Sequence, residues 1–453
     1  MVSERPSSAR YLVLAWFCAL AMLAYVQRNS LAVPAKQVAR DLDIGVDDMD
    51  AVLGMFFWGY AALQVPAGWL GWRFGSRAVV PLVILVCSAA NALQALATDV
   101  SSLLTLRFVM GMAQAALFPC AVQSFAAWFP PAERAMPSGW LAAFMSVGGA
   151  LALALTGGLL DLLSWQALMV VYAAPGLVCA VWFYVWFRDT PAQHGNLRHS
   201  VIVSAPSLQD ARTNDGIQRA RGEAPTSGDA NGPVSVADAA PPSIEVAWYQ
   251  VLFTPDALLV YLQQFCRAAA YIFYATMWPL FLQDGRGLRV AESGYVGSLP
   301  LLGVVFGSAC GGQVMDWVYR RTGSVAWSRR GVALANLSAA ALFMVLGYLC
   351  VDVWLTVLFL TISSVCAGAC GPAAYTATID LGGRHVATVF SVMNMSGNIG
   401  AALLPTAVIA VKDVHGWNSV LLLLAGLYVV SAVCWLLVRL PGALPGRHAG
   451  RNA

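Results

Sequence analysis

Three arginines could do chemistry in this chain, because each falls in a segment that is otherwise apolar: Arg28, Arg107 and Arg267. A guanidinium stays charged at any working pH and binds a carboxylate or phosphate through two parallel hydrogen bonds. A charge in the middle of a membrane helix costs about 2.5–3.5 kcal/mol, so it needs a cavity or a partner. We therefore expect the three arginines to attract an anion. The alternatives are an Arg107 that only ties two helices together and an Arg267 that reaches back to the membrane surface.

Other polar side chains accompany these arginines at helical spacing. Gln114 follows Arg107 by seven residues, close to two turns, so the two lie on one helix face. Tyr25 precedes Arg28 by one turn and could donate a hydrogen bond to the same ligand. Asn394 lies in another apolar segment, where it faces either a cavity or a neighbouring helix. We take Tyr25, Gln27, Gln114 and Asn394 as candidate substrate contacts beside the arginines.

The composition decides the environment of these residues. Of the 453 residues, 59% are hydrophobic and 11% are charged, whereas about a quarter of a soluble protein is charged. Twelve apolar segments can be counted, each near the roughly 20 residues that cross a bilayer. They lie near residues 11–34, 48–71, 78–98, 101–127, 134–160, 165–187, 252–283, 292–318, 331–350, 353–379, 384–411 and 417–440. The sequence predicts an all-α polytopic membrane protein.

One long segment interrupts the apolar pattern. Residues 190–249 are rich in Pro, Ser, Gly, Asp and Arg, which predicts a disordered linker. It separates a six-helix bundle over 1–189 from a second over 250–453, which ends in a short tail. Of the 26 Lys and Arg, 18 lie on the side of the linker and the termini, and 5 lie in loops on the other side. By the positive-inside rule, linker and both termini are cytoplasmic in a multi-pass inner (plasma) membrane protein.

The two halves repeat a short basic turn after their second helix. The first copy contains Gly68, Arg73, Gly75 and Arg77, and the second contains Asp316, Arg320 and Arg321 after Gly312. A repeat at corresponding positions is typical of transporters built from a duplicated six-helix unit. We expect these seven residues to act in gating.

The twelve spans, the central linker and the turn pattern resemble the major facilitator superfamily. Three stretches are similar to its anion:cation symporters, a group that includes vesicular glutamate carriers and bacterial sugar-acid permeases. They are Tyr25-Val26-Gln27-Arg28-Asn29, the helix of Arg107 with Phe118-Pro119 and the later Trp128-Phe129-Pro130-Pro131-Ala132-Glu133-Arg134, and Asn394-Met395-Ser396-Gly397-Asn398-Ile399-Gly400. The resemblance implies two pseudo-symmetric six-helix bundles that work by alternating access. It also implies that Arg28 and Arg107 recognise the anion and that Asn394 faces the cavity.

The chain departs from the family pattern at three places. The superfamily has an Asp at the fifth place of the turn, where the first copy here has Trp72 and the second keeps Asp316. The symporters have acids where this chain has Gln27 and Gln114, and an amide cannot exchange a proton in their place. The cavity then keeps its full arginine charge at every pH, and moving that charge unaccompanied is unfavourable. We expect anion exchange or facilitated uptake rather than proton symport through Gln27 and Gln114.

The remaining polar residues exclude other classes of function. All 23 Asp and Glu lie in loops, tails or helix ends, and the 5 histidines are peripheral. With no nucleotide-binding loop or metal cluster, we expect no enzyme, cofactor, metal or nucleic-acid partner. The sequence predicts a monomeric secondary transporter of a small organic anion, such as a sugar acid or an aromatic acid, with a counter-anion or co-transported ion. The alternatives are an organophosphate or phosphonate exchanger, a drug efflux carrier and a non-transporting membrane sensor.

Overall fold

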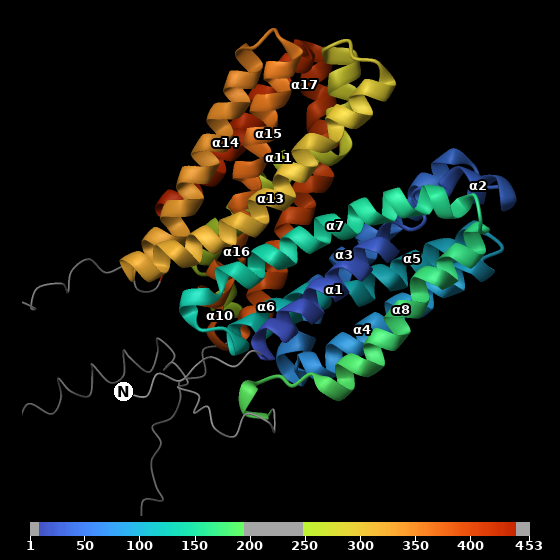
Figure 1. The fold of residues 1–453 in the computed structure, drawn as a ribbon, viewed down its shortest axis with the longest axis horizontal. Helices are drawn as coiled ribbons and strands as arrows, with labels where there is room; N and C mark the ends of the chain where they lie inside the picture. Colours follow the sequence, from blue (N-terminus) through green and yellow to red (C-terminus); the bar gives the residue numbers. More distant parts are fainter. Residues whose placement is uncertain (1–8, 194–247, 441–453) are drawn as a thin grey trace, which may run out of the picture.

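The computed structural model describes residues 9–193 and 248–440, which form two bundles of helices (Figure 1). The first bundle contains α1 (Ala9–Asn29), α3 (Val46–Phe74), α4 (Ser76–Leu93), α5 (Val100–Gln114), α6 (Leu117–Trp128), α7 (Ala135–Leu160) and α8 (Trp165–Trp186). The second contains α11 (Pro255–Thr276), α13 (Val290–Thr322), α14 (Val332–Leu349), α15 (Val353–Ala369), α16 (Gly371–Gly382) and α17 (Val386–Leu437).

The described residues contain enough helix for twelve membrane crossings, six in each bundle. Ten helical stretches are long and apolar enough to span a bilayer. One of them, α17, turns at Gly416 with φ 78° and therefore counts as two crossings. The twelfth is α11, which is less apolar than the ten because it carries Gln263, Gln264 and Arg267. The predicted all-α fold of twelve membrane helices is confirmed.

Several predicted segments differ from the helices in detail. The predicted spans 101–127 and 353–379 are each two helices, broken between α5 and α6 and between α15 and α16. These breaks occupy corresponding places in the two bundles, as expected for a duplicated unit. The predicted span 252–283 is α11 followed by the short α12 (Trp278–Leu280) and the π-helical η4 (Phe281–Gly285). A short helix, α2 (Ala35–Asp41), was not predicted.

The predicted linker 190–249 lies mostly outside the described residues. Only its two ends are described, as the 3-10 turn η3 (Pro191–Gln193) and the start of α10 (Trp248–Leu252). The predicted tail after residue 440 also lies outside them.

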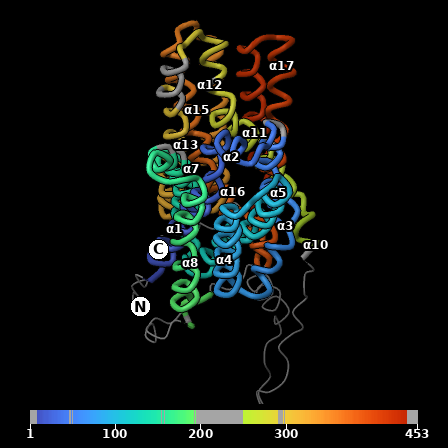
Figure 2. The backbone as a smooth tube through the Cα atoms, turned by 90° about the vertical axis from the view of Figure 1, so that its right-hand side faces the viewer, coloured from blue at the N-terminus to red at the C-terminus, as the bar shows by residue number. Residues whose placement is uncertain are grey.

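The two bundles meet at one end and diverge toward the other, where α2 lies (Figure 1). Turned by 90°, Figure 2 shows α4 and α8 side by side in the first bundle, where they pack together. At the end where the bundles meet, which we call the closed end, α3 contacts α17 and α7 contacts α13. The start of α1 belongs there too, since Arg10 pairs with Glu133 at 2.7 Å just before α7. We call the other end the open end.

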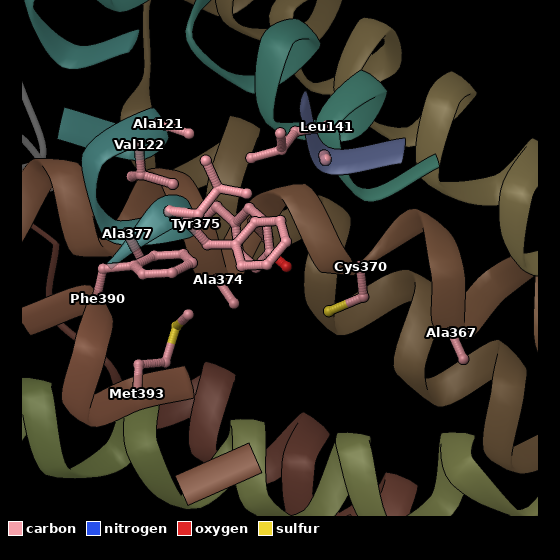
Figure 3. Close-up of a cluster of buried hydrophobic side chains, with 14 of the residues drawn as sticks. Ala121, Val122, Leu141, Ala367, Cys370, Ala374, Tyr375, Ala377, Phe390 and Met393 are labelled. Carbon is pink, nitrogen blue, oxygen red and sulfur yellow. The ribbon is translucent and has the colours of Figure 1, made fainter. Parts of the chain in front are cut away.

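Small residues allow the bundles to pack closely at the closed end. A Cβ at Gly68 of α3 would collide with Ser391 Oγ and the carbonyl oxygen of Ala387 on α17, so only glycine permits this crossing. Nearby, a cluster of buried apolar side chains joins Ala121 and Val122 of α6 and Leu141 of α7 to Tyr375 of α16 and Phe390 and Met393 of α17 (Figure 3). The apolar core is thus continuous from one bundle to the other.

Candidate functional site

Arg28 and Arg107 lie next to each other in the first bundle. Arg107 of α5 is 3% exposed and donates from Nη1 to the backbone oxygen of Arg28, in the last turn of α1, at 3.1 Å. None of the ion pairs among the described residues involves either arginine. Two positive charges are therefore held together without a carboxylate to balance them.

Aromatic rings hold this pair of arginines in place. The ring of Phe56 on α3 lies 4.9 Å from Arg28 Cζ and 5.5 Å from Arg107 Cζ. Tyr25 and Phe57 also face Arg28, at 5.2 and 4.5 Å. Such cation–π contacts contribute about 0.5–2 kcal/mol each and leave the formal charge intact. The half-buried Arg28 side chain makes no hydrogen bond to any described residue, so its N–H groups are available to a ligand.

Arg267 occupies the second bundle, well inside α11. Its Nε and Nη2 both donate to Oε1 of Gln264, at 3.3 and 3.0 Å, and its Nη1 is 3.5 Å from the backbone oxygen of Ala367. Gly397 of α17 makes room for this arrangement, because a Cβ there would come within 3.0 Å of Gln264 Nε2. The guanidinium is held inside the bundle, and the alternative of a side chain reaching back to the surface does not describe this structure.

Tyr271 connects the arginines of the two bundles. It follows Arg267 by about one turn on α11 and lies near Ser146 of α7 in the first bundle. Its hydroxyl also lies within electrostatic range of Tyr25 and Arg28 in the first bundle and of Arg267 in its own. Arg28 of the first bundle and Arg267 of the second thus both lie near Tyr271, and Arg107 is joined to Arg28.

Asn394 also reaches across from the second bundle. Its Nδ2 donates to the hydroxyl of Tyr60 on α3 at 2.7 Å, and Tyr60 in turn stacks on Phe56 with ring centroids 6.0 Å apart. Asn398 donates to the backbone oxygen of Asn394. Sequence reasoning missed Tyr60 and Phe56, because they lie in an aromatic run that gives no polar signal. It also missed Gln264, which precedes Arg267 by three residues and could have been found on its helix face.

Gln27 and Gln114 both lie inside the first bundle. The amide of Gln27 donates to Ser88 Oγ and to the backbone oxygen of Tyr172, both at 3.0 Å. Gln114 donates to the backbone oxygen of Ala24 at 2.9 Å, and its Oε1 has no hydrogen-bond partner among the described residues. The two side chains line one small cavity. Their amides therefore bind the bundle itself here, and their predicted contact with substrate stays a prediction.

The first basic turn is held mainly within its own bundle. Gly75 ends α3 with φ 78°, and Arg77 of α4 bonds through its backbone N–H to Asp189 Oδ1 at 3.0 Å. Arg73 is exposed. Beyond the Gly68 crossing, Trp72 reaches the second bundle, with its ring 4.9 Å from that of His385.

The second basic turn crosses to the first bundle through Asp316. This carboxylate is 2% exposed and accepts the backbone N–H groups of Ala135 and Met136, at 3.1 and 2.8 Å. These are N–H groups of the first turn of α7, which have no partner inside their own helix and lie at its positive end. Arg320 and Arg321 are exposed. Of the three gating residues predicted in this turn, Asp316 is therefore the one that makes a hydrogen bond to the opposite bundle.

A buried arginine outside the predicted set supports Asp316. Arg329 is 1% exposed, lies 3.9 Å from Asp316 and 3.5 Å from Asp380, and donates to the backbone oxygen of Pro131 in the first bundle at 3.0 Å. The sequence places it among the basic residues of a turn, but the π-helical η5 (Ala326–Gly331) turns it inward. Among the described residues, no group of three or more His, Cys, Asp or Glu could hold a metal ion.

Comparisons with known proteins agree with this architecture. A family model described as Major Facilitator Superfamily matches residues 16–328 and 260–452. A probable sulfoacetate transporter of Cupriavidus necator is 25% identical over 87% of this chain and 86% of its own length. The D-galactonate transporter of Escherichia coli is 25% identical over 96% of this chain and 97% of its own.

Solved structures share the fold. The Escherichia coli fucose:proton symporter superposes with a TM-score of 0.67 at 15% identity, over 95% of this chain and 99% of its own. A human organic anion transporter does so with a TM-score of 0.63 at 16% identity, over 95% of this chain and 100% of its own. With the family model matching nearly the whole chain and the twelve helices arranged in two bundles, this protein belongs to the Major Facilitator Superfamily.

Proposed function

We propose that this protein is a secondary carrier that moves a small organic anion across the membrane by alternating access between its two bundles. The observation that carries the proposal is the convergence of Arg28, Arg107 and Arg267 between the bundles, without an acidic partner among the described residues. Nothing in this arrangement calls for bond-breaking chemistry, so we propose a carrier rather than an enzyme.

Electrostatics favours an anionic substrate over a neutral one. Unbalanced guanidinium groups with low-dielectric walls raise the local concentration of anions, and the aromatic rings around Arg28 hold it without neutralising it. The relatives described above are named as a probable transporter of sulfoacetate and a transporter of D-galactonate, and both substrates are small organic anions. A drug efflux carrier is less favoured because an apolar drug would leave the three arginine charges uncompensated. Neither of the relatives described above is named as a phosphate-ester exchanger.

We propose that the closed end faces the cytoplasm. The basic turns of both halves lie at this end, and the excess of Lys and Arg follows the positive-inside rule. The structure would then be open toward the outside, ready to receive substrate. A reporter enzyme that works only in the cytoplasm should be active when it is fused at Gly232, and one that works only outside should be inactive there. The opposite pattern would reverse the assignment.

The same geometry supports transport without proton coupling through Gln27 and Gln114. Both amides donate to backbone carbonyl oxygens, a role that an ionised carboxylate cannot take. The arginine charge therefore stays constant with pH, and a second anion is the natural means of returning the carrier. In proteoliposomes, internal anion should accelerate uptake, and a pH gradient alone should drive little accumulation. Concentrative uptake driven by that gradient, with no anion inside, would refute this mode of coupling.

The experiment that tests the carrier is uptake of labelled sulfoacetate, D-galactonate and D-glucarate into proteoliposomes. Arg28→Ala and Arg107→Ala should abolish uptake while membrane abundance stays normal. Lys should rescue poorly, because it lacks the bidentate fork. Arg40→Ala, which removes an exposed arginine of α2, is the matched control and should transport like the parent. Parent rates in both central variants would move the anion site elsewhere, and a parent that carries none of a broad anion panel would favour the sensor alternative.

A further inference from the structure

The three central arginines are divided between the two bundles. Arg28 and Arg107 are joined directly in the first bundle by a hydrogen bond to the backbone. Arg267 stands apart in the second bundle, on α11. Tyr271 lies within electrostatic range of both Arg28 and Arg267, so the two groups face one shared region. The region therefore has two positively charged ends, one contributed by each bundle.

At the second of these ends, the positive charge of Arg267 is not balanced by a carboxylate among the described residues. Arg267 binds the amide oxygen of Gln264 with two of its nitrogens and approaches the backbone oxygen of Ala367 with the third. Both acceptors are neutral, so they orient the guanidinium but leave its charge in place. None of the ion pairs among the described residues includes Arg267. Gly371 at the start of α16 lies beside Nη1, where an added Cβ would be in ordinary van der Waals contact at 3.8 Å.

A purely structural role would account poorly for this arginine. The contact with Ala367 is 3.5 Å long, at the limit of a hydrogen bond, so it holds α11 to α15 only weakly. A glutamine or serine could make the same contact without the cost of a charge inside the membrane. A positive charge at this place is better explained by an anionic group that arrives with the substrate.

We propose that the substrate is a dianion with one anionic group at each end, held by Arg28 and Arg107 in the first bundle and by Arg267 in the second. This inference rests on the proposed function and adds the charge and shape of the substrate. Three arginines keep two net positive charges with a monoanion but only one with a dianion. A two-ended anion also touches both bundles at once, so it draws them together when the carrier closes around it.

The test compares pairs of anions that differ only in the charge of the far end. D-Galactonate and galactarate share a six-carbon skeleton and end in a hydroxymethyl group or a second carboxylate, and succinamate and succinate form a smaller pair. Apparent Kd is obtained for the purified full-length protein at pH 7.5 from the rise of melting temperature with ligand concentration. The parent should bind the dianion of each pair about tenfold more tightly or better.

Arg267→Gln should remove this preference selectively. We expect it to weaken binding of the dianion about tenfold and that of the monoanion less than about threefold. Arg267→Lys keeps the charge and should retain part of the preference. Lys412→Gln, which removes a positive charge at the far end of the same bundle, should retain all of it.

Two results would overturn the inference. One is a parent that binds both members of each pair equally, which is decided without any variant. The other is an Arg267→Gln protein that loses affinity for both members by the same factor, as expected for damage to the fold. In either case, anion uptake that still depends on Arg28 leaves the proposed function intact. Only a parent that neither binds nor transports any anion removes both proposals.

Discussion

The two halves of this chain close the same end of the molecule with different chemistry. In the second half, Asp316 accepts two backbone N–H groups at the start of α7 in the opposite bundle. In the first half, the corresponding place is Trp72, which packs against His385 just before α17. The repeated turns put both residues opposite the start of a helix in the other bundle, but only one of them supplies a negative charge there.

The difference between Asp316 and Trp72 shows that the two copies of the turn can hold the bundles together by different contacts. The carboxylate of Asp316 matches the unpaired N–H groups and the positive end of α7, and Arg329 with Asp380 surrounds it with further charge. Trp72 offers only a ring contact, while α17 begins without a side-chain cap. At that crossing, close packing of Gly68 against α17 replaces the polar contact. We therefore expect the two turns to contribute very unequally to closure.

Asp316→Ala should have the largest effect. It leaves two buried N–H groups and Arg329 short of a partner, and breaking a buried ion pair costs about 3–5 kcal/mol. The closed end should open, which is measured as faster maleimide labelling of a cysteine introduced at Ala387, a residue buried between α3 and α17. Asp316→Asn keeps one acceptor oxygen and should lie between this variant and the parent. Labelling at the parent rate in Asp316→Ala would show that the packing alone closes the bundles.

Trp72→Ala should have a smaller effect in the same direction. It removes one aromatic contact between the bundles, a contribution of about 0.5–1.5 kcal/mol. Labelling at Ala387 should rise only modestly, and the melting temperature should fall less than for Asp316→Ala. A loss as large as that of Asp316→Ala would mean that the two turns are energetically equivalent despite their chemistry.

Trp72→Asp sharpens the comparison by giving the first turn the residue of the second. A carboxylate opposite the start of α17 would gain up to about 1–2 kcal/mol from the helix end, which offsets the lost ring contact. We expect the rate of maleimide labelling to lie between the rates of Trp72→Ala and the parent. A variant more open than Trp72→Ala would indicate that the carboxylate cannot reach the start of α17.

Arg321→Ala should have the smallest effect. This arginine is exposed, and its guanidinium lies over the ring of Trp317, 5.6 Å away, within its own turn. Exposed charges of this kind contribute about 0–1 kcal/mol. Labelling and melting temperature should match the parent at physiological ionic strength, and a clear opening would restore Arg321 to the predicted gating set.

The membrane character of this chain and the identity of its arginines could be predicted from the sequence. Apolar length is a local property, so the twelve segments can be counted without knowing how they pack, and Arg28, Arg107 and Arg267 are evident wherever they point. The turn copies and their one difference, Trp72 against Asp316, are equally visible because they are a matter of residue type at a repeated spacing.

What these residues touch was decided only by the tertiary structure. Asp316 and Ala135 are far apart in the chain, as are Asn394 and Tyr60, and no local pattern predicts which hydroxyl or N–H each will find. In the sequence, Arg329 is one of several basic residues of a turn. In the structure, the π-helical η5 places it between the carboxylates of Asp316 and Asp380. Periodicity fixes the face of a helix, but partners across a bundle depend on how helices cross, and that is set by the packing of the whole core.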